Sequence, residues 1–276
     1  MSINDVDFQY IRQLVRTHTS VSLTEDKAYL VESRLKSLAQ KVSLNSVSQL
    51  IQKLRIQSFN DLHLQVIESM MTTETWFFRD TYPFEAVRER ILPELINKRQ
   101  NQRSLNIWCA ASSSGQEPYS IAILLKEHFP QLASWTISLI ASDISHKMLE
   151  KARQGNYSQH EMSRGLSPDL REKYFQPQGK EWQLTTEIRQ MIAFRQFNLI
   201  DSWSSMPLMD IIFLRNVLIY FDVEMKQSIL AKVKQLLKPD GYLFLGGGET
   251  TINLDRAFKT VRFNKAIYYQ LTMTAG

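Results

Sequence analysis

The sequence lacks the features of a disulfide-rich, membrane-spanning or disordered protein. Its 276 residues include one cysteine, Cys109, so no disulfide can form within the chain and a reducing compartment is expected. The most apolar stretch, residues 211–221, is interrupted by Arg215 and Asn216 and is too short to cross a bilayer. Hydrophobic residues at 43% and charged residues at 22% are typical of a globular protein. With no signal peptide visible, we expect a cytoplasmic protein with no direct membrane insertion.

Metal-binding and nucleic-acid-binding patterns are missing as well. The five histidines are scattered without ligand spacing, so we expect no metal. No tract rich in lysine and arginine stands out, and we expect no nucleic-acid partner. The 33 basic and 28 acidic residues leave a charge of +5, which favours acidic partners in general without choosing among them.

The chain changes character near Pro83. Before it, apolar residues recur at helical spacing, as in Phe8, Ile11, Leu14 and Val15, which predicts a small all-helical domain. After it, short apolar runs alternate with amphipathic segments, which predicts strands separated by helices and therefore a parallel α/β sheet. A final pair of runs, around 258–263 and 266–271, predicts a closing hairpin.

The predicted organisation therefore has three parts. They are an N-terminal helical domain at 1–71, a linker at 72–84, and an α/β domain at 85–276. Residues 167–197 contain β-type residues that do not follow the alternation. We interpret them as a small helix and a few antiparallel strands, a β-subdomain inserted beside the main sheet.

Polar residues follow three of the predicted strands, where ligands bind in open α/β sheets. The turn at 110–118 has small residues and then Glu117, whose carboxylate suits a cationic ligand or caps the following helix. Asp143 ends the next strand, where an acid can bind ribose hydroxyls or cap a helix. Arg215 and Asn216 follow a third strand. A nucleoside site with a carboxylate and no phosphate-binding loop suggests S-adenosylmethionine.

Five segments resemble the CheR family, the chemotaxis receptor methyltransferases. Residues 71–80 (MTTETWFFRD) resemble the family's TTNxTxFFR, and residues 113–120 (SSGQEPYS) resemble its turn STG[EQ]EPYS. Residues 141–144 (ASDI), 214–221 (LRNVLIYF) and 237–241 (LKPDG) match further motifs in the same order. The resemblance covers nearly the whole chain, although the first 60 residues match only in helical character.

The resemblance implies a Rossmann-like S-adenosylmethionine-dependent methyltransferase domain that methylates glutamate side chains on chemoreceptor cytoplasmic helices. By motif position it implies cofactor contacts at Thr73, Thr75, Arg79, Glu117, Asp143, Asn198, Leu199, Arg215 and Asn216, with the linker contributing to the site. Tyr220 matches a tyrosine near the transferred methyl group, and we expect Tyr220 and Arg215 to be catalytic. Thr73 stands where many members have asparagine, and its hydroxyl can still hydrogen-bond.

Two expectations concern the receptor. Basic residues Arg34, Lys36 and Lys41 in a predicted helix are candidates for binding the acidic receptor helices, although an ordinary solvated surface is the alternative. Between Phe175 and Ile192 the chain is a few residues shorter than in members whose β-subdomain docks a receptor's C-terminal pentapeptide. We therefore expect an enzyme that works without this tether.

Two other functions remain open at this point. A nucleic-acid methyltransferase would share the fold, but enzymes that methylate exocyclic amines typically carry [DN]PPY where this chain has residues 215–218 (RNVL). A non-catalytic module that senses the cofactor and signals through a partner is the second alternative.

Overall fold

A computed structural model describes residues 3–272. The chain divides into two compact units, one formed by Met1–Thr72 with Tyr220–Met225 and the other by Thr73–Ile219 with Lys226–Gly276. Among the described residues, no helix combines the length and the apolar character that a bilayer crossing requires.

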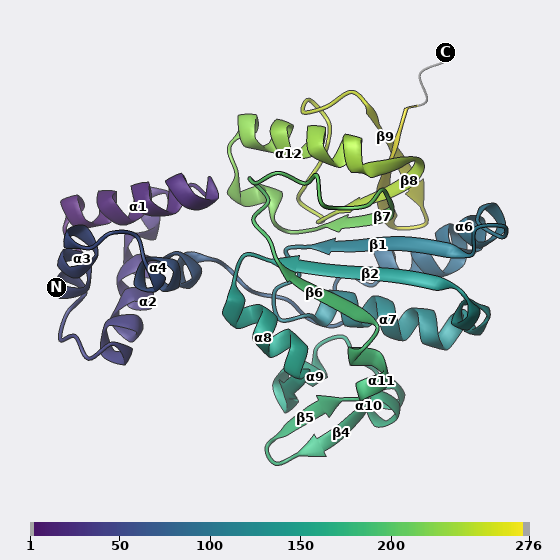
Figure 1. The fold of residues 1–276 in the computed structure, drawn as a ribbon, viewed down its shortest axis with the longest axis horizontal. Coiled ribbons are helices and arrows are strands. Elements are labelled where there is room, and N and C mark those ends of the chain that lie inside the picture. The colour runs from purple at the N-terminus through teal and green to yellow at the C-terminus, as the bar shows by residue number, and fades with distance from the viewer. Residues whose placement is uncertain (1–2, 273–276) are drawn as a thin grey trace. The chain divides into compact units, whose positions relative to one another are not determined.

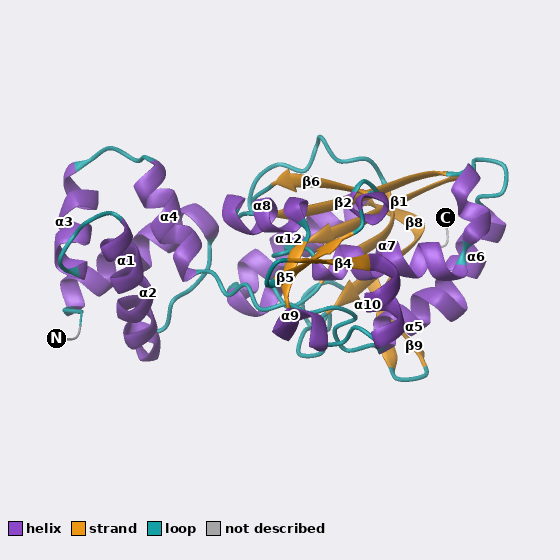
Figure 2. Cartoon of the chain, turned by 90° about the horizontal axis from the view of Figure 1, so that it is seen from below, coloured by secondary structure: helices purple, strands orange, loops and turns teal. Residues whose placement is uncertain are grey.

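The N-terminal unit is helical, as predicted. Its elements are α1 (Asp5–Thr19), the short 3-10 turn η1 (Glu25–Lys27), α2 (Ala28–Lys41), α3 (Val47–Ile56) and α4 (Asp61–Met70) (Figure 2). Side chains of Asn4, Ser46 and Asn60 accept backbone N–H groups at the starts of α1, α3 and α4, which satisfies donors that a helix leaves unpaired. Fully buried Ile11 and Leu35 belong to its core.

The second unit is built on a seven-stranded sheet in the order β6-β2-β1-β7-β8-β10-β9 (Figure 1). The strands are β1 (Ser104–Ala110), β2 (Thr136–Asp143), β6 (Ile192–Gln196), β7 (Met209–Leu214), β8 (Leu237–Leu245), β9 (Phe258–Phe263) and β10 (Ala266–Leu271). Neighbours from β6 to β8 are parallel, whereas β10 is antiparallel to both β8 and β9. The parallel sheet and the closing hairpin are both confirmed.

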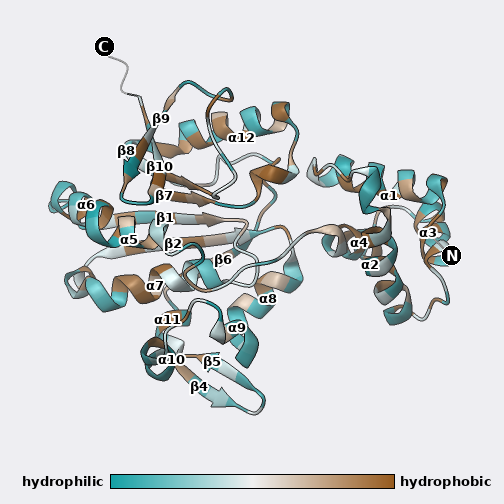
Figure 3. Cartoon of the chain, turned by 180° about the vertical axis from the view of Figure 1, so that it is seen from behind, coloured by the Kyte–Doolittle hydropathy of each residue, from teal (hydrophilic) through white to brown (hydrophobic). Residues whose placement is uncertain are grey.

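The connections between the strands are mostly helical. They comprise α7 (Gln116–His128), η3 (Pro130–Ser134), α8 (His146–Gln154), η4 (Leu218–Tyr220) and α12 (Val223–Leu236). Before β1 come α5 (Tyr82–Ala86), the π-helical turn η2 (Val87–Ile91) and α6 (Leu92–Lys98). All six residues of β7 are buried, as expected for a strand covered on both faces, and its apolar colour is clear in Figure 3. Cys109 in β1 is a buried free thiol, as its apolar surroundings predict.

A small antiparallel sheet accompanies the main one, but its bounds differ from the expected 167–197. Its strands are β3 (Asn156–Ser158), β5 (Glu181–Leu184) and β4 (Phe175–Gln178), in that order across the sheet. Helices α9 (Gln159–Ser163), α10 (Pro168–Tyr174) and α11 (Thr186–Arg189) complete the segment. The segment thus starts before residue 167, and β6 pairs with β2 in the main sheet. Short half-exposed strands carry too little periodicity to reveal which sheet they join.

The pairing of strand β8 is interrupted at residues 238–241, within the LKPDG motif. The register with β7 passes from Met209 opposite Leu237 to Ile211 opposite Tyr242, so the residues between have no partner on β7. The backbone folds back tightly here, because a Cβ on Gly241 would lie 3.0 Å from the carbonyl oxygen of Lys238. Residues 238–241 therefore form a bulge within β8.

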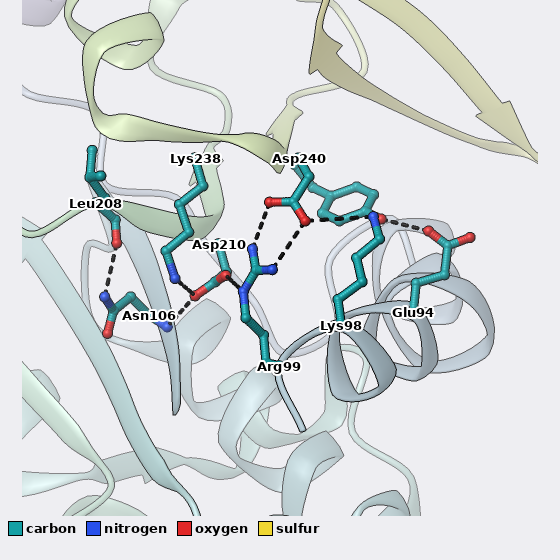
Figure 4. Close-up of polar contacts among 9 residues, drawn as sticks. Glu94, Lys98, Arg99, Asn106, Leu208, Asp210, Lys238 and Asp240 are labelled. Carbon is teal, nitrogen blue, oxygen red and sulfur yellow. Dashed lines mark hydrogen bonds and ion pairs between the residues drawn. The ribbon is translucent and has the colours of Figure 1, made fainter. Parts of the chain in front are cut away.

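A network of charged side chains holds this bulge at the amino ends of β1 and β7 (Figure 4). Asp210 is fully buried and accepts bonds from Arg99 Nε at 3.0 Å, Lys238 Nζ at 2.8 Å and the Asn106 backbone N–H at 2.9 Å. Arg99 also binds both carboxylate oxygens of Asp240, at 2.6 and 3.1 Å. The hydrogen bonds from Arg99 lower the pKa of Asp240 below its ordinary value.

Replacing Asp240 by Asn should destabilise the protein in a pH-dependent way. A carboxyl whose folded pKa is lowered adds stability above its unfolded pKa, near 3.9, and loses that contribution as the pH falls through the folded value. Because the site is partly exposed, we expect D240N to lose about 1 kcal/mol of unfolding free energy at pH 7. Urea titrations should show the two proteins converging below about pH 4. An equal difference at pH 3 and pH 7 would contradict this assignment.

Candidate functional site

The polar segments that follow β1, β2, β7 and β8 share one edge of the second unit's sheet. These strands are mutually parallel and end at Ala110, Asp143, Leu214 and Leu245. Their carboxyl ends therefore meet, and the sequence-predicted residues Glu117, Asp143 and Arg215 come from these ends. In the described part of the chain, no group of three or more His, Cys, Asp or Glu side chains could hold a metal ion.

The turn after β1 brings its backbone close to neighbouring elements. Gly115 has a φ of 93° and a Cβ there would lie 2.9 Å from the Cβ of Ala152, so both conformation and space require glycine. The Ser112 N–H donates to the carbonyl of Ser142 at 2.8 Å. The hydroxyl of Ser112 in this turn is buried, and its Oγ has no hydrogen-bond partner among the described residues.

Asp143 ties this turn to the start of α8. Its Oδ2 accepts the N–H of Ser113 at 2.8 Å, and its Oδ1 accepts the N–H of Ser145 at 2.9 Å. The helix cap itself is Ser145, whose side chain accepts the N–H of Met148. Asp143 therefore joins the turn after β1 to the start of α8 through both of its carboxylate oxygens.

Arg215 is the most deeply buried charge at this edge, with 1% of its side chain exposed. Its Nη1 donates to Glu117 Oε2 at 2.6 Å, while its Nη2 donates to Asp80 Oδ2 at 2.6 Å and to the Arg79 carbonyl at 3.0 Å. Two predicted residues, Arg215 and Glu117, are thus in direct contact. Burial raises the pKa of Glu117 and the Arg215 guanidinium opposes this rise, so we treat Glu117 as half of an ion pair.

The segment at 73–80 lies against the same edge. The carbonyl of Thr73 accepts the hydroxyl of Ser113 at 2.7 Å, and Thr75 is half-buried. Arg79 stacks on Trp76, with its guanidinium carbon 4.2 Å from the ring centroid. The Nε atoms of Arg79 and Arg215 are buried without a hydrogen-bond partner among the described residues.

Glu249 is a residue that sequence reasoning missed. Its Oε2 accepts the N–H groups of Asn216 at 2.7 Å and Gly246 at 2.6 Å, and its Oε1 accepts that of Ile219 at 3.2 Å. Asn216 has a φ of 58°, so this carboxylate holds a left-handed backbone directly after Arg215. The only sequence signal was an acid after three glycines that follow a strand, which fits a flexible turn equally well.

Asn198 and Leu199 lie on a loop that a second missed residue holds. Lys232 Nζ, from α12, donates to the carbonyls of Leu199 at 3.1 Å, Ile200 at 2.8 Å and Asp201 at 2.7 Å. Leu199 is buried, and Asn198 Oδ1 accepts the N–H of Ile200 at 3.4 Å. The sequence does not predict that Lys232 binds these carbonyls, because most lysines on amphipathic helices face solvent.

The remaining candidates belong to the N-terminal unit. Tyr220 is half-buried, and its carbonyl accepts the N–H of Ser22 at 3.2 Å. Arg34 Nη1 donates to the carbonyl of Met70 at 2.7 Å and so caps the end of α4, whereas Lys36 and Lys41 are exposed. Lys36 also lies about 200° around α2 from Arg34, so the three do not share one face.

Two family models match the chain, and together they cover most of its length. Residues 73–267 match the family described as CheR methyltransferase, SAM binding domain, and residues 6–71 match the CheR methyltransferase, all-alpha domain. Chemotaxis protein methyltransferase Cher2 of Pseudomonas putida is 40% identical over 275 residues, 98% of this chain and 99% of that protein. Chemotaxis protein methyltransferase 1 of Pseudomonas aeruginosa is also 40% identical, with the same coverage.

One solved structure that the chain matches is a magnesium protoporphyrin IX methyltransferase from Synechocystis PCC 6803 with bound SAM. It is 15% identical at a TM-score of 0.38, over 85% of this chain and 93% of that chain.

Glu249→Gln should loosen the segment after β7. Glutamine keeps the size but replaces one acceptor oxygen with an NH₂ group, so at least one of three backbone N–H groups loses its partner. We expect a loss of about 1–3 kcal/mol in unfolding free energy and faster amide exchange at Asn216 and Ile219. The exposed Glu172→Gln variant is the control. Unchanged exchange at Asn216 would contradict the role of Glu249.

Proposed function

The chain belongs to the CheR methyltransferase family, and from this premise we propose that it methylates glutamate side chains on the cytoplasmic helices of chemoreceptors, with S-adenosylmethionine as donor. The observation that carries the proposal is the group formed by Asp143, Glu117 and Arg215 at the carboxyl edge of the sheet. We propose further that the protein acts in the cytoplasm, as its role in receptor adaptation requires.

The residues at this edge have the chemistry of a donor site. The buried partnerless atoms Ser112 Oγ, Arg79 Nε and Arg215 Nε come from three segments that line it, and such atoms are normally satisfied by water or a ligand. Asp143 ends the second strand, where a carboxylate accepts ribose hydroxyls in nucleotide-binding α/β folds. The remaining residues proposed to hold the donor are Thr73, Thr75, Arg79, Glu117, Asn198, Leu199, Arg215 and Asn216.

Charge at the edge also suits this donor. Asp80 and Glu117 both bind Arg215, so the three side chains together carry one net negative charge when all are ionised. A net negative, poorly solvated site attracts a sulfonium and an ammonium group and repels phosphate. We propose that Glu117 holds the amino end of the donor.

Methyl transfer to a glutamate side chain needs no general base. A glutamate side chain has an ordinary pKa near 4.3 and is already ionised at pH 7. S-adenosylmethionine supplies an electrophilic methyl group on sulfur, and transfer to the carboxylate yields a methyl ester and S-adenosylhomocysteine. The protein's part is to align the acceptor oxygen and to exclude water from it. We propose that Tyr220 and Arg215 perform this alignment.

Methyl transfer from labelled donor to a receptor cytoplasmic fragment tests the proposal. A methyl ester releases its label as methanol in mild base, which distinguishes it from methylated nucleic acid. We expect base-labile label, and equal labelling of fragments with and without the C-terminal five residues, because we propose an enzyme independent of that tether. Label only in nucleic acid, or donor binding without any transfer, would contradict the proposal.

Two variants should separate donor binding from alignment. Asp143→Asn should weaken S-adenosylhomocysteine binding about 10- to 100-fold in calorimetry, because a charged acceptor for ribose hydroxyls is lost. Tyr220→Phe should leave that affinity unchanged and lower kcat by about 10-fold or more. Collapse of donor binding in Tyr220→Phe would show that Tyr220 has another role.

The receptor-facing proposal rests on Lys36 and Lys41, which lie about 140° apart around α2 and are therefore changed singly as well as together. Receptor methylation helices are acidic, and both lysines are exposed on α2, whereas Arg34 is engaged with the Met70 carbonyl. The double change Lys36→Glu and Lys41→Glu should lower receptor methylation about 3- to 10-fold at low salt, with a smaller effect at high salt. Lys180→Glu with Lys259→Glu makes the same change of charge at exposed sites elsewhere. Equal effects of both pairs would contradict docking on α2.

A further inference from the structure

Two guanidinium groups contact the ring of Trp76. The guanidinium carbon of Arg79 is 4.2 Å from the Trp76 ring centroid, and that of Arg164 is 4.3 Å from it. Both distances fall well within the range of a cation–π contact, in which the negative face of the ring attracts a cation. The indole therefore attracts the side chains of both Arg79 and Arg164.

Arg164 also holds the segment that carries Trp76. Its Nη2 binds Glu74 Oε1 at 3.1 Å, and Arg79 Nη1 donates to the Glu74 carbonyl at 3.0 Å. The next residue, Gly165, has a φ of 81° and packs so closely that a Cβ would lie 1.8 Å from the Phe77 carbonyl oxygen. The loop between α9 and α10 is therefore pressed against residues 74–79.

Aromatic contacts join the same two parts of the chain. The ring of Phe77 meets those of Tyr157 and Phe175 edge-on, with centroids 5.1 and 5.5 Å away. The Tyr157 hydroxyl donates to the Ser114 carbonyl at 2.7 Å, in the turn after β1. Residues of the small β-subdomain thus contact both segments that lead to the proposed donor site.

We propose that Arg164 is a positioning residue for methyl transfer, acting through Trp76 to hold Arg79 in place, and this rests on the proposed function of Arg79. In this role the small subdomain holds residues 74–79 in place beside the proposed donor site, independently of any receptor tether. The Arg164–Glu74 ion pair is partly exposed, so most of the effect comes from stacking and close packing.

The test measures S-adenosylhomocysteine affinity by calorimetry and methyl-transfer kinetics for the full chain. Arg164→Ala should raise the Kd of the product and the KM of the donor about 2- to 10-fold, the range expected for one partly exposed cation–π contact, with kcat within about twofold of wild type. Arg164→Lys keeps a cation over Trp76 and should restore most of the affinity. In a Trp76→Leu background, Arg164→Ala should cause no further loss.

The matched control is Arg171→Ala. Arg171 stacks on Trp182 at 5.5 Å in the same subdomain, away from residues 74–79, so its loss should not alter donor affinity. Equal losses of donor affinity in both alanine variants, or an unchanged Kd in Arg164→Ala, would contradict the role of Arg164. The proposed function would still stand if the wild-type protein methylated the receptor fragment. No heat with the wild-type protein would overturn the proposed function and this inference with it.

Discussion

The burial of the Arg215 guanidinium is the constraint on which the site depends. Removing a charge from water is costly unless it is paired and hydrogen-bonded, and Arg215 meets this condition through Glu117 and Asp80. Those partners come from the start of α7 and from the segment before α5, so one side chain joins three separate parts of the second unit. Truncating Arg215 would leave Glu117 and Asp80 without their cation.

A buried charged side chain lies at each end of strand β7. The two side chains differ in how fully their polar atoms are hydrogen-bonded. At its amino end Asp210 is surrounded by Arg99, Lys238 and a backbone N–H, and it stabilises the bulge in β8. At its carboxyl end Arg215 keeps a buried Nε without a partner among the described residues. Asp210 finds its partners within the protein, whereas the Nε donor of Arg215 is one that water or a ligand can satisfy.

Much of the fold and part of the site could be predicted from the sequence. Alternating strands and helices determine which ends of the strands meet, so Glu117 and Arg215 could be assigned to one edge from periodicity alone. Glu249 and Lys232 could not, because their roles consist of accepting or donating bonds to backbone atoms far away in the sequence. The edge strand β6 was misassigned for a similar reason, since a short strand's partner depends on tertiary packing.

A crystal structure of the protein with S-adenosylhomocysteine tests the central claim most directly. The account predicts ribose hydroxyls within hydrogen-bonding distance of Asp143, the amino group on Glu117, and the Arg215 ion pairs retained. Product bound elsewhere, or bound at this edge without contact to either carboxylate, would contradict it.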